Sequence, residues 1–173
     1  MSRKLVLFFS VYGTARRIAE EIARQARADL MEIEPTVPYD SNKKHYDALA
    51  RAAKREMDEN QRPSIKNHLP VSEYDVIFLG YPIWWYSLPM IIRTLFDQYD
   101  FSEKTILPFN THMGSRDSST WQIIQALAPK ALMGEGLSIE MEDVERDSGK
   151  AVAHWLGSLY QDKRPERPFS QPE

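Results

Sequence analysis

The chain of 173 residues contains no cysteine and has almost no net charge. Without cysteine it forms no disulfide, holds no thiolate-bound metal and has no thiol nucleophile. The formal net charge is −3, and Lys and Arg are scattered among acidic residues, which excludes the basic patches typical of nucleic-acid-binding proteins. The same small charge argues against the strongly acidic surface with which electron carriers steer toward basic partners. The histidines have no spacing that indicates a metal site.

Long apolar runs are also absent, and none approaches the roughly 18 residues that a membrane span needs. Near the N-terminus, Arg3 and Lys4 precede the apolar run 5–9 in a way that imitates a short signal peptide. We interpret the run as a buried first strand, because it is short and Arg16 soon follows it. The sequence therefore predicts a cytoplasmic protein without a membrane partner.

Short apolar runs alternate with stretches of helical periodicity along most of the chain. The run 5–9 is apolar at every position, which is typical of a strand buried on both faces of a parallel sheet. Between Ala15 and Ala26, by contrast, apolar residues recur at helical spacing. This alternation predicts one doubly wound α/β domain over residues 1–160, and the charged, proline-rich residues 161–173 predict a disordered tail. The expected strands are 5–9, 30–33, 76–79, 105–109 and one within 132–139, and the expected helices are 15–26, 41–60, 88–99, 118–128 and 144–160.

Three loops follow predicted strands, and the first runs from Ser10 to Ala15 directly into a helix. In open α/β sheets, ligands bind outside the carboxyl ends of the strands, where such loops meet. The free N–H groups and positive dipole end of a helix start favour an anion. Gly13 permits close backbone approach, and Ser10 and Thr14 offer hydroxyl donors. A phosphate site and an ordinary capped turn both fit this loop, whereas the absence of a Walker pattern argues against a nucleoside triphosphate.

The second loop, residues 81–89, is rich in aromatic side chains. Adjacent residues of an extended segment face opposite ways, so Trp84 and Trp85 cannot both point into one core. At least one of them is free to form the wall of a pocket, and flat aromatic walls suit a flat ring system. Coverage of the sheet end, or a contact between subunits, is the alternative that the composition leaves open.

The third loop, residues 110–117, is small and polar and follows a buried strand. Gly114 allows a ligand to approach the backbone closely. His112 can donate a hydrogen bond or a proton near neutral pH, although a lone histidine of this kind is also a common surface residue.

These segments resemble the flavodoxins. Residues 5–22 are similar to the first strand, phosphate loop and first helix of that family, and residues 74–85 resemble a segment of short flavodoxin-like proteins with a Gly-Tyr-Pro-x-Trp-Trp loop. The resemblance implies a flavodoxin-like three-layer fold, with a five-stranded parallel sheet in the order 2-1-3-4-5, and FMN as the cofactor. It places the phosphate at the first loop and the isoalloxazine between the second and third loops. The residues expected to bind the cofactor are Ser10, Tyr12, Gly13, Thr14, Ala15, Pro82, Ile83, Trp84, Trp85, Tyr86, Thr111, His112, Met113 and Gly114.

The first loop departs from the family pattern Ser/Thr-x-Thr-Gly-Asn-Thr. Tyr12 and Ala15 replace threonines, and Thr14 replaces the asparagine, so small polar donors are altered or lost. Each lost neutral hydrogen bond removes about 0.5–1.5 kcal/mol. Backbone donors and Arg16 or Arg17 are expected to offset part of this loss. Tyr86 stands where a smaller residue is common and is expected to narrow the pocket.

Three functions remain open at this stage. The resemblance implies an FMN-dependent oxidoreductase, with NAD(P)H and a quinone-like acceptor as substrates and no assigned catalytic side chain. A flavodoxin-type electron carrier with a protein redox partner is the second. A flavodoxin-like module that has lost FMN and binds another ligand or protein is the third, and the altered first loop motivates it. Aromatic loop residues are also compatible with a homodimer.

Overall fold

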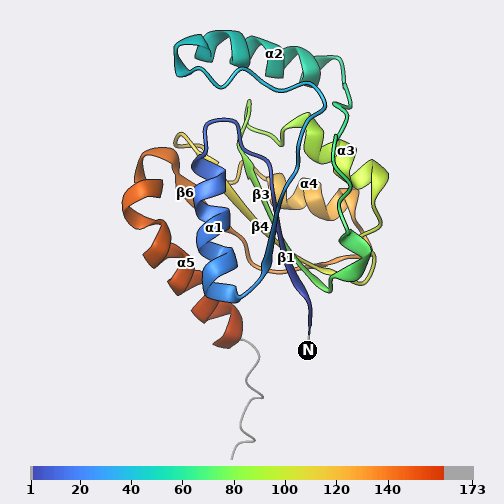
Figure 1. Ribbon diagram of the computed structural model, residues 1–173, viewed down its shortest axis with the longest axis vertical. Coiled ribbons are helices and arrows are strands. Elements are labelled where there is room, and N and C mark those ends of the chain that lie inside the picture. Colours follow the sequence, from blue (N-terminus) through green and yellow to red (C-terminus); the bar gives the residue numbers. More distant parts are fainter. Residues whose placement is uncertain (1, 162–173) are drawn as a thin grey trace, which may run out of the picture.

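A parallel β-sheet occupies the middle of the computed structural model, which describes residues 2–161 (Figure 1). Its strand order is β2-β1-β3-β4-β5, and a further strand, β6, also pairs with β4. The predicted order is therefore confirmed, and the sheet has one strand more than expected. The strands are β1 (Lys4–Phe8), β2 (Asp29–Glu32), β3 (Val76–Pro82), β4 (Thr105–His112), β5 (Leu132–Met133) and β6 (Leu137–Glu140).

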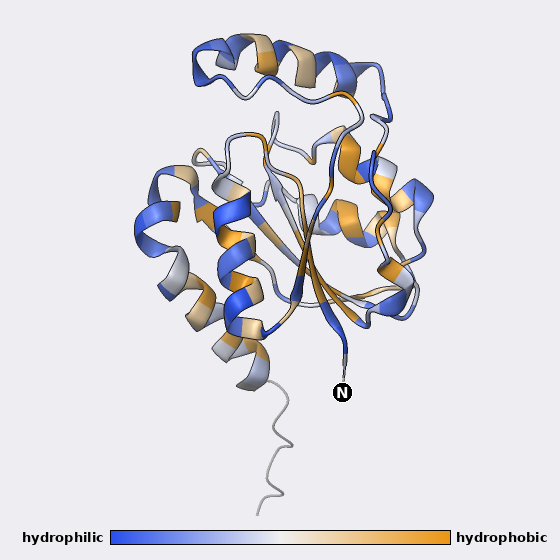
Figure 2. Cartoon of the chain, viewed as in Figure 1, coloured by the Kyte–Doolittle hydropathy of each residue, from blue (hydrophilic) through white to orange (hydrophobic). Residues whose placement is uncertain are grey.

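Helices cover both faces of the sheet, as the alternation of strand and helix predicts. Two apolar clusters result, one on each face, and the strands supply residues to both because they are buried on both sides. Figure 2 shows the apolar residues of the helices turned toward the sheet. The helices α1 (Thr14–Ala26) and α5 (Val144–Gln161) pack on one face, and α3 (Met90–Gln98) and α4 (Thr120–Leu127) on the other.

The helix α2 (Tyr46–Asp58) belongs to neither layer. It lies across the carboxyl-end edge of the sheet, apart from the strands (Figure 1). The segment 61–74, which ends in a 3-10 turn at Val71–Glu73, instead packs on the face of the sheet that α3 and α4 also cover, and its Leu69 and Val71 are buried there. The Leu69 N–H donates to the Tyr99 hydroxyl over 3.0 Å, which fixes this segment against α3. A helix within 41–60 was predicted, but its displacement to the edge was not.

The fifth strand differs from the prediction, because the segment 132–139 forms two strands. β5 pairs with the start of β4 and β6 with its end, and Gly134 and Gly136 lie between them. Side chains of the neighbouring elements occupy the space beside both glycines. A Cβ at Gly134 would lie 2.2 Å from Leu107, and one at Gly136 would lie 2.5 Å from Trp121. The chain therefore needs glycine at both positions to pass close to β4 and α4.

The third loop also differs from the prediction, because β4 continues to His112. Asn110, Thr111 and His112, expected in a loop, are strand residues paired with β6. The Ser138 hydroxyl and Asn110 Oδ1 lie 2.7 Å apart, which adds a side-chain bond to this pairing. The last helix extends one residue beyond the predicted end, to Gln161, and the predicted disordered tail otherwise lies outside the described residues. Among those residues, no helix combines the length and apolar composition needed to span a bilayer.

Candidate functional site

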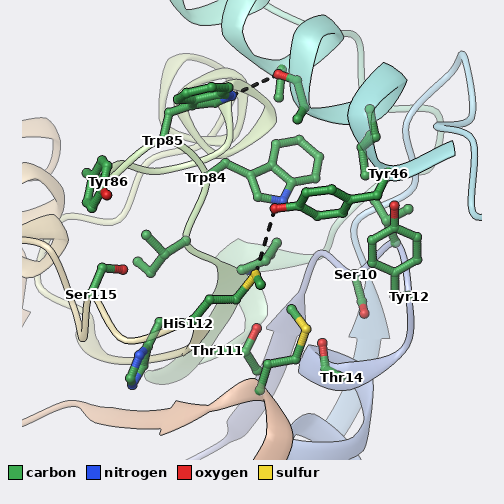
Figure 3. Close-up of a pocket in the computed structure, with 18 of the residues that line it drawn as sticks. Ser10, Tyr12, Thr14, Tyr46, Trp84, Trp85, Tyr86, Thr111, His112 and Ser115 are labelled. Atoms are coloured by element: carbon green, nitrogen blue, oxygen red, sulfur yellow. Dashed lines mark hydrogen bonds between the residues drawn. The ribbon is translucent and has the colours of Figure 1, made fainter. Parts of the chain in front are cut away.

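A cavity of about 420 Å³ lies at the carboxyl ends of the strands, next to α2 (Figure 3). All three loops singled out in the sequence reach it. Of the residues expected to bind a cofactor, those that line the cavity are Ser10, Tyr12, Thr14, Pro82, Ile83, Trp84, Trp85, Tyr86, Thr111, His112 and Met113. Gly13, Ala15 and Gly114 are not among the lining residues, since Ala15 is buried in the packing of α1 and the two glycines shape the backbone of their loops.

The first loop brings the start of α1 to this cavity. Gly13 occupies the N-cap with a φ of 94°, a left-handed conformation, and no side chain caps the helix. The Gly13 N–H donates to Ser10 Oγ over 3.1 Å, so this serine shapes the loop and its own hydroxyl hydrogen stays free to donate. The next N–H groups, in the first turn, have no intrahelical partner. The first turn contains no acidic residue, and an anion is therefore favoured here.

Arg16 is not positioned to replace the donors lost from the first loop. Its guanidinium pairs with Glu32 at 2.5 Å and lies over the Phe8 ring at 5.0 Å from the centroid. Neither Arg16 nor Arg17 lines the cavity. The expectation that one of them offsets the lost donors is therefore not met by this arrangement, and the backbone N–H groups are the donors that remain.

The second loop makes a tight turn in an unusual conformation. Trp84 and Ser87 exchange both backbone hydrogen bonds at 3.0 Å, and the two residues between them have positive φ, 51° at Trp85 and 59° at Tyr86. Turns with two left-handed central residues strongly favour Asn-Gly. Aromatic residues in this conformation store strain of about 1–3 kcal/mol each, and such strain concentrates at binding sites.

We expect Tyr86→Gly to raise the free energy of unfolding by about 1 kcal/mol, because glycine adopts the left-handed conformation without strain. Tyr86 is 74% exposed, so the substitution removes little packing. Urea denaturation measures the effect. Tyr86→Ala is the matched control, since it removes the ring but keeps the Cβ that causes the strain. Equal stabilities of the Gly and Ala variants would contradict the assignment of strain to this turn.

The two tryptophans of this loop point in different directions. Trp84 is partly buried and makes edge-to-face contacts with Phe9 and Tyr39, both with ring centroids 5.3 Å apart. Trp85 is 44% exposed, and its indole N–H donates to the Ala50 carbonyl of α2 over 2.8 Å. Both rings line the cavity, and Trp84 is held more firmly because it is also part of the core packing.

His112, at the end of β4, is buried and is one of the residues that line the cavity. Its Nδ1 accepts from the Gly114 N–H over 2.9 Å, which leaves the proton of the neutral ring on Nε2. Burial lowers the pKa of His112, with nearby Glu140 acting in the opposite direction. The ring is therefore neutral at pH 7 and can donate one hydrogen bond through Nε2.

Because the pKa of His112 is lower in the folded chain, acid is expected to destabilise the protein. Below about pH 6.5 the unfolded chain binds a proton at this ring that the folded chain excludes. Stability is thus full above that pH and falls as the pH decreases. Urea denaturation between pH 5 and pH 8 tests this, with His112→Gln expected to flatten the profile between pH 5 and about pH 6.5. If the free energy of unfolding of His112→Gln depends on pH as it does in the natural chain, other groups cause the pH dependence.

Two buried polar atoms at the cavity have no partner among the described residues. They are the Tyr12 hydroxyl, from the first loop, and Thr111 Oγ1, from β4. Burial raises the pKa of Tyr12, so its hydroxyl stays protonated and available as a donor. Native proteins leave few buried polar groups unpaired, and each requires an explanation. A polar ligand in the cavity would provide the missing partners.

The helix α2 contributes to the site, which was not predicted from the sequence. Figure 3 shows Tyr46 of α2 reaching into the cavity, where its hydroxyl lies 3.7 Å from Met113 Sδ of the third loop. A helix over 41–60 was predicted, but nothing in its sequence indicated that it covers the edge of the sheet. The cavity residues that were not expected are Val11, Tyr46, Asp47, Leu49, Ala50, Ala53, Ser115 and Met141.

The walls of the cavity indicate the chemistry of its ligand. Aromatic rings from three elements, an uncapped helix start and unpaired donors suit a flat aromatic molecule that carries an anionic group. Within residues 2–161, no cluster of His, Asp and Glu could hold a metal ion. The cavity therefore has the features of a binding site for an organic ligand.

The sheet order, together with a ligand cavity at the carboxyl ends of the strands, defines a flavodoxin-like α/β protein. The family model described as Flavodoxin matches residues 3–158, and the chain belongs to this family.

Solved structures agree with this assignment. A protein from Bacteroides eggerthii that is described as a flavoprotein is 32% identical to this chain. The two structures align with a TM-score of 0.78, over 92% of this chain and 99% of the other. One from Bacteroides uniformis is 30% identical, with a TM-score of 0.79 over 90% of this chain and 98% of its own. A flavoprotein from Lactobacillus acidophilus in complex with FMN shares the fold at 21% identity and a TM-score of 0.66, over 84% of this chain and 98% of its own. No curated protein sequence matches the chain.

Proposed function

We propose that the protein is a flavoprotein that binds FMN in the cavity next to α2 and acts as an oxidoreductase. The observation that carries this proposal is the meeting of an uncapped helix start and several aromatic rings in one cavity of about 420 Å³. That volume lies within the usual range for small-molecule sites. The flavodoxin family and the FMN complex of the Lactobacillus acidophilus flavoprotein support the choice of ligand.

The residues at the cavity fit the parts of FMN. The backbone of the Ser10–Ala15 loop and the first turn of α1 would hold the phosphate, since this end of the cavity favours an anion. Trp84, Trp85 and Tyr86, with Pro82 and Ile83, would line the ring system. Thr111 and His112 would donate hydrogen bonds to its polar edge, with the backbone at Met113 and Gly114 beside them. When bound, FMN supplies reversible two-electron and one-electron redox chemistry, which no side chain here provides.

An enzyme acting on small molecules is favoured over a carrier that docks on proteins. α2 covers the outer side of the cavity with Tyr46 and Ala50, which limits the approach of a protein partner. The net charge of −3 offers weak electrostatic steering. NAD(P)H as donor and a quinone-like compound as acceptor are the proposed substrates. A cytoplasmic location and a homodimer stay predictions from the sequence.

Titration of the purified apoprotein with FMN, followed by the change in flavin fluorescence, tests the cofactor. Saturable one-to-one binding is expected. Steady-state oxidation of NADPH with a soluble quinone then separates the enzyme from a carrier, because a carrier shows little turnover without a reductase. Absence of saturable FMN binding would favour the third alternative, a flavodoxin-like module that binds another ligand or a protein.

A further inference from the structure

A second cavity, of about 460 Å³, lies along a neighbouring face of α2. We call it the α2 groove. One wall is the helix face that carries Ala48, Ala52 and Glu56, four residues apart, so it is a strip of small side chains with a carboxylate at one end. The opposite wall is the segment 35–40, which runs along α2 in Figure 1, and residues 61–64 close the end.

Glu56 is one of two acidic residues that line this groove, and it has no cationic partner among the residues that the structure describes. The Tyr39 hydroxyl lies 2.9 Å from both carboxylate oxygens and can donate only one proton. A carboxylate offers about four acceptor positions, so most of those on Glu56 have no partner among the described residues. Burial raises the pKa of Glu56, which means that its charge is incompletely solvated where it lies.

No lysine or arginine lines the α2 groove, and its second acid, Asp40, is engaged elsewhere. Asp40 accepts hydrogen bonds from the Asn42 backbone and pairs with His45. The groove therefore has an excess of negative charge that is concentrated at Glu56. Glu56 is partly buried, and a carboxylate in such a position is stabilised by a cation that also hydrogen-bonds to it.

The α2 groove is lined by small side chains and by prolines, so its walls cannot close over the Glu56 carboxylate. Pro35, Pro38 and Pro63 fix the backbone on one side, and alanines form the helix side. Tyr39 is held in place by edge contacts with Phe9, at 5.5 Å, and with Trp84, at 5.3 Å. A site that is already formed loses little entropy when a ligand binds.

We propose that the α2 groove binds a small organic cation, a protonated amine on an apolar chain, with Glu56 as the charge partner. The ammonium group would bind the free acceptor positions of Glu56, while the chain would lie along Ala52 and the prolines. This site is distinct from the cavity proposed for FMN. The two are joined by Leu49, which lines both, and by the contact between Tyr39 and Trp84.

Calorimetric titration of the full-length apoprotein with n-hexylammonium chloride tests this proposal without any flavin. Saturable binding is expected, and the neutral analogue hexan-1-ol is expected to bind at least tenfold more weakly. Glu56→Gln keeps the shape of the side chain and is expected to lower hexylammonium affinity at least tenfold. Glu59→Gln, which removes an exposed carboxylate next to the same helix end, is the matched control and is expected to bind normally.

A second variant keeps the proposal testable if the Glu56→Gln variant does not fold. Ala52→Leu places a larger apolar side chain in the groove and is expected to abolish hexylammonium binding while the circular dichroism spectrum stays unchanged. Absence of saturable binding to the natural chain, equal affinity for the alcohol, or normal binding by Glu56→Gln would each overturn the proposal. None of these results bears on FMN binding, so the two proposals fail independently.

Discussion

Replacement of Gly13 by aspartate is expected to weaken FMN binding by at least about 100-fold, or roughly 2.7 kcal/mol. Gly13 is the N-cap of α1, directly beside the free N–H groups proposed to hold the phosphate. An aspartate there would place a negative charge where the helix start attracts one. Its carboxylate would also accept the hydrogen bonds that the phosphate needs. Fluorescence titration with FMN measures the loss.

Gly13→Asn is the matched control for this prediction. Asparagine has nearly the shape of aspartate without the charge, and it tolerates the left-handed conformation that Gly13 adopts at a φ of 94°. A Cβ at this position meets nothing within 4 Å, and both variants carry the same backbone strain at this φ, so the charge is the main difference between them. Riboflavin lacks the phosphate and should bind both variants equally. If the two variants bind FMN with the same affinity, the phosphate lies away from the first loop.

Replacement of Gly80 by alanine is expected to lower the free energy of unfolding by about 3 kcal/mol, the upper end of the range for overpacking. Gly80 lies opposite Phe109 in the pairing of β3 with β4. A Cβ at Gly80 would lie 2.1 Å from the Phe109 ring, which is itself fully buried. The interior is close-packed, so the Phe109 ring can move aside only if its neighbours also shift, and the strain reaches the backbone. Urea denaturation measures the effect.

Two further variants show whether this clash is the cause. Gly157→Ala introduces the same methyl group within α5, where a Cβ meets nothing within 4 Å, and is expected to stabilise the protein slightly. Phe109→Leu in the Gly80→Ala background is expected to lower stability by less than the sum of the two single effects, since it makes room for the new Cβ. Additive losses would show that the Phe109 ring is not the obstacle.

Much of the fold could be predicted from local patterns. The strands 5–9 and 76–79 were recognisable because burial on both faces requires an apolar side chain at every position. The order of the strands came from the resemblance to flavodoxins. The division of the fifth strand was not foreseen, because the requirement for Gly134 and Gly136 comes from Leu107 and Trp121, which are distant in sequence. The extension of β4 likewise depends on its pairing with β6.

The parts of the site that follow strands were predicted from the sequence. The part that α2 supplies was not, because it depends on where this helix packs in the folded chain. Trp84 and Trp85 were singled out because neighbouring side chains face opposite ways, and both line the cavity. Tyr46 was not predicted, because the apolar pattern of a helix does not indicate which surface the helix covers. The left-handed turn at Trp85 and Tyr86 also escaped prediction, because aromatic residues disfavour that conformation and surrounding structure must impose it.

The displacement of α2 has a consequence for how this protein can evolve. The segment 61–74, not α2, packs against the sheet, so substitutions on the helix leave the packing of the sheet intact when they spare the buried Leu49 and Ala53. Substitutions at the exposed positions of α2 can therefore alter the covering of the ligand cavity with little effect on the stability of the fold. Lineages that share this sheet are thus free to diverge in what they bind, and the fastest change is expected along residues 46–58.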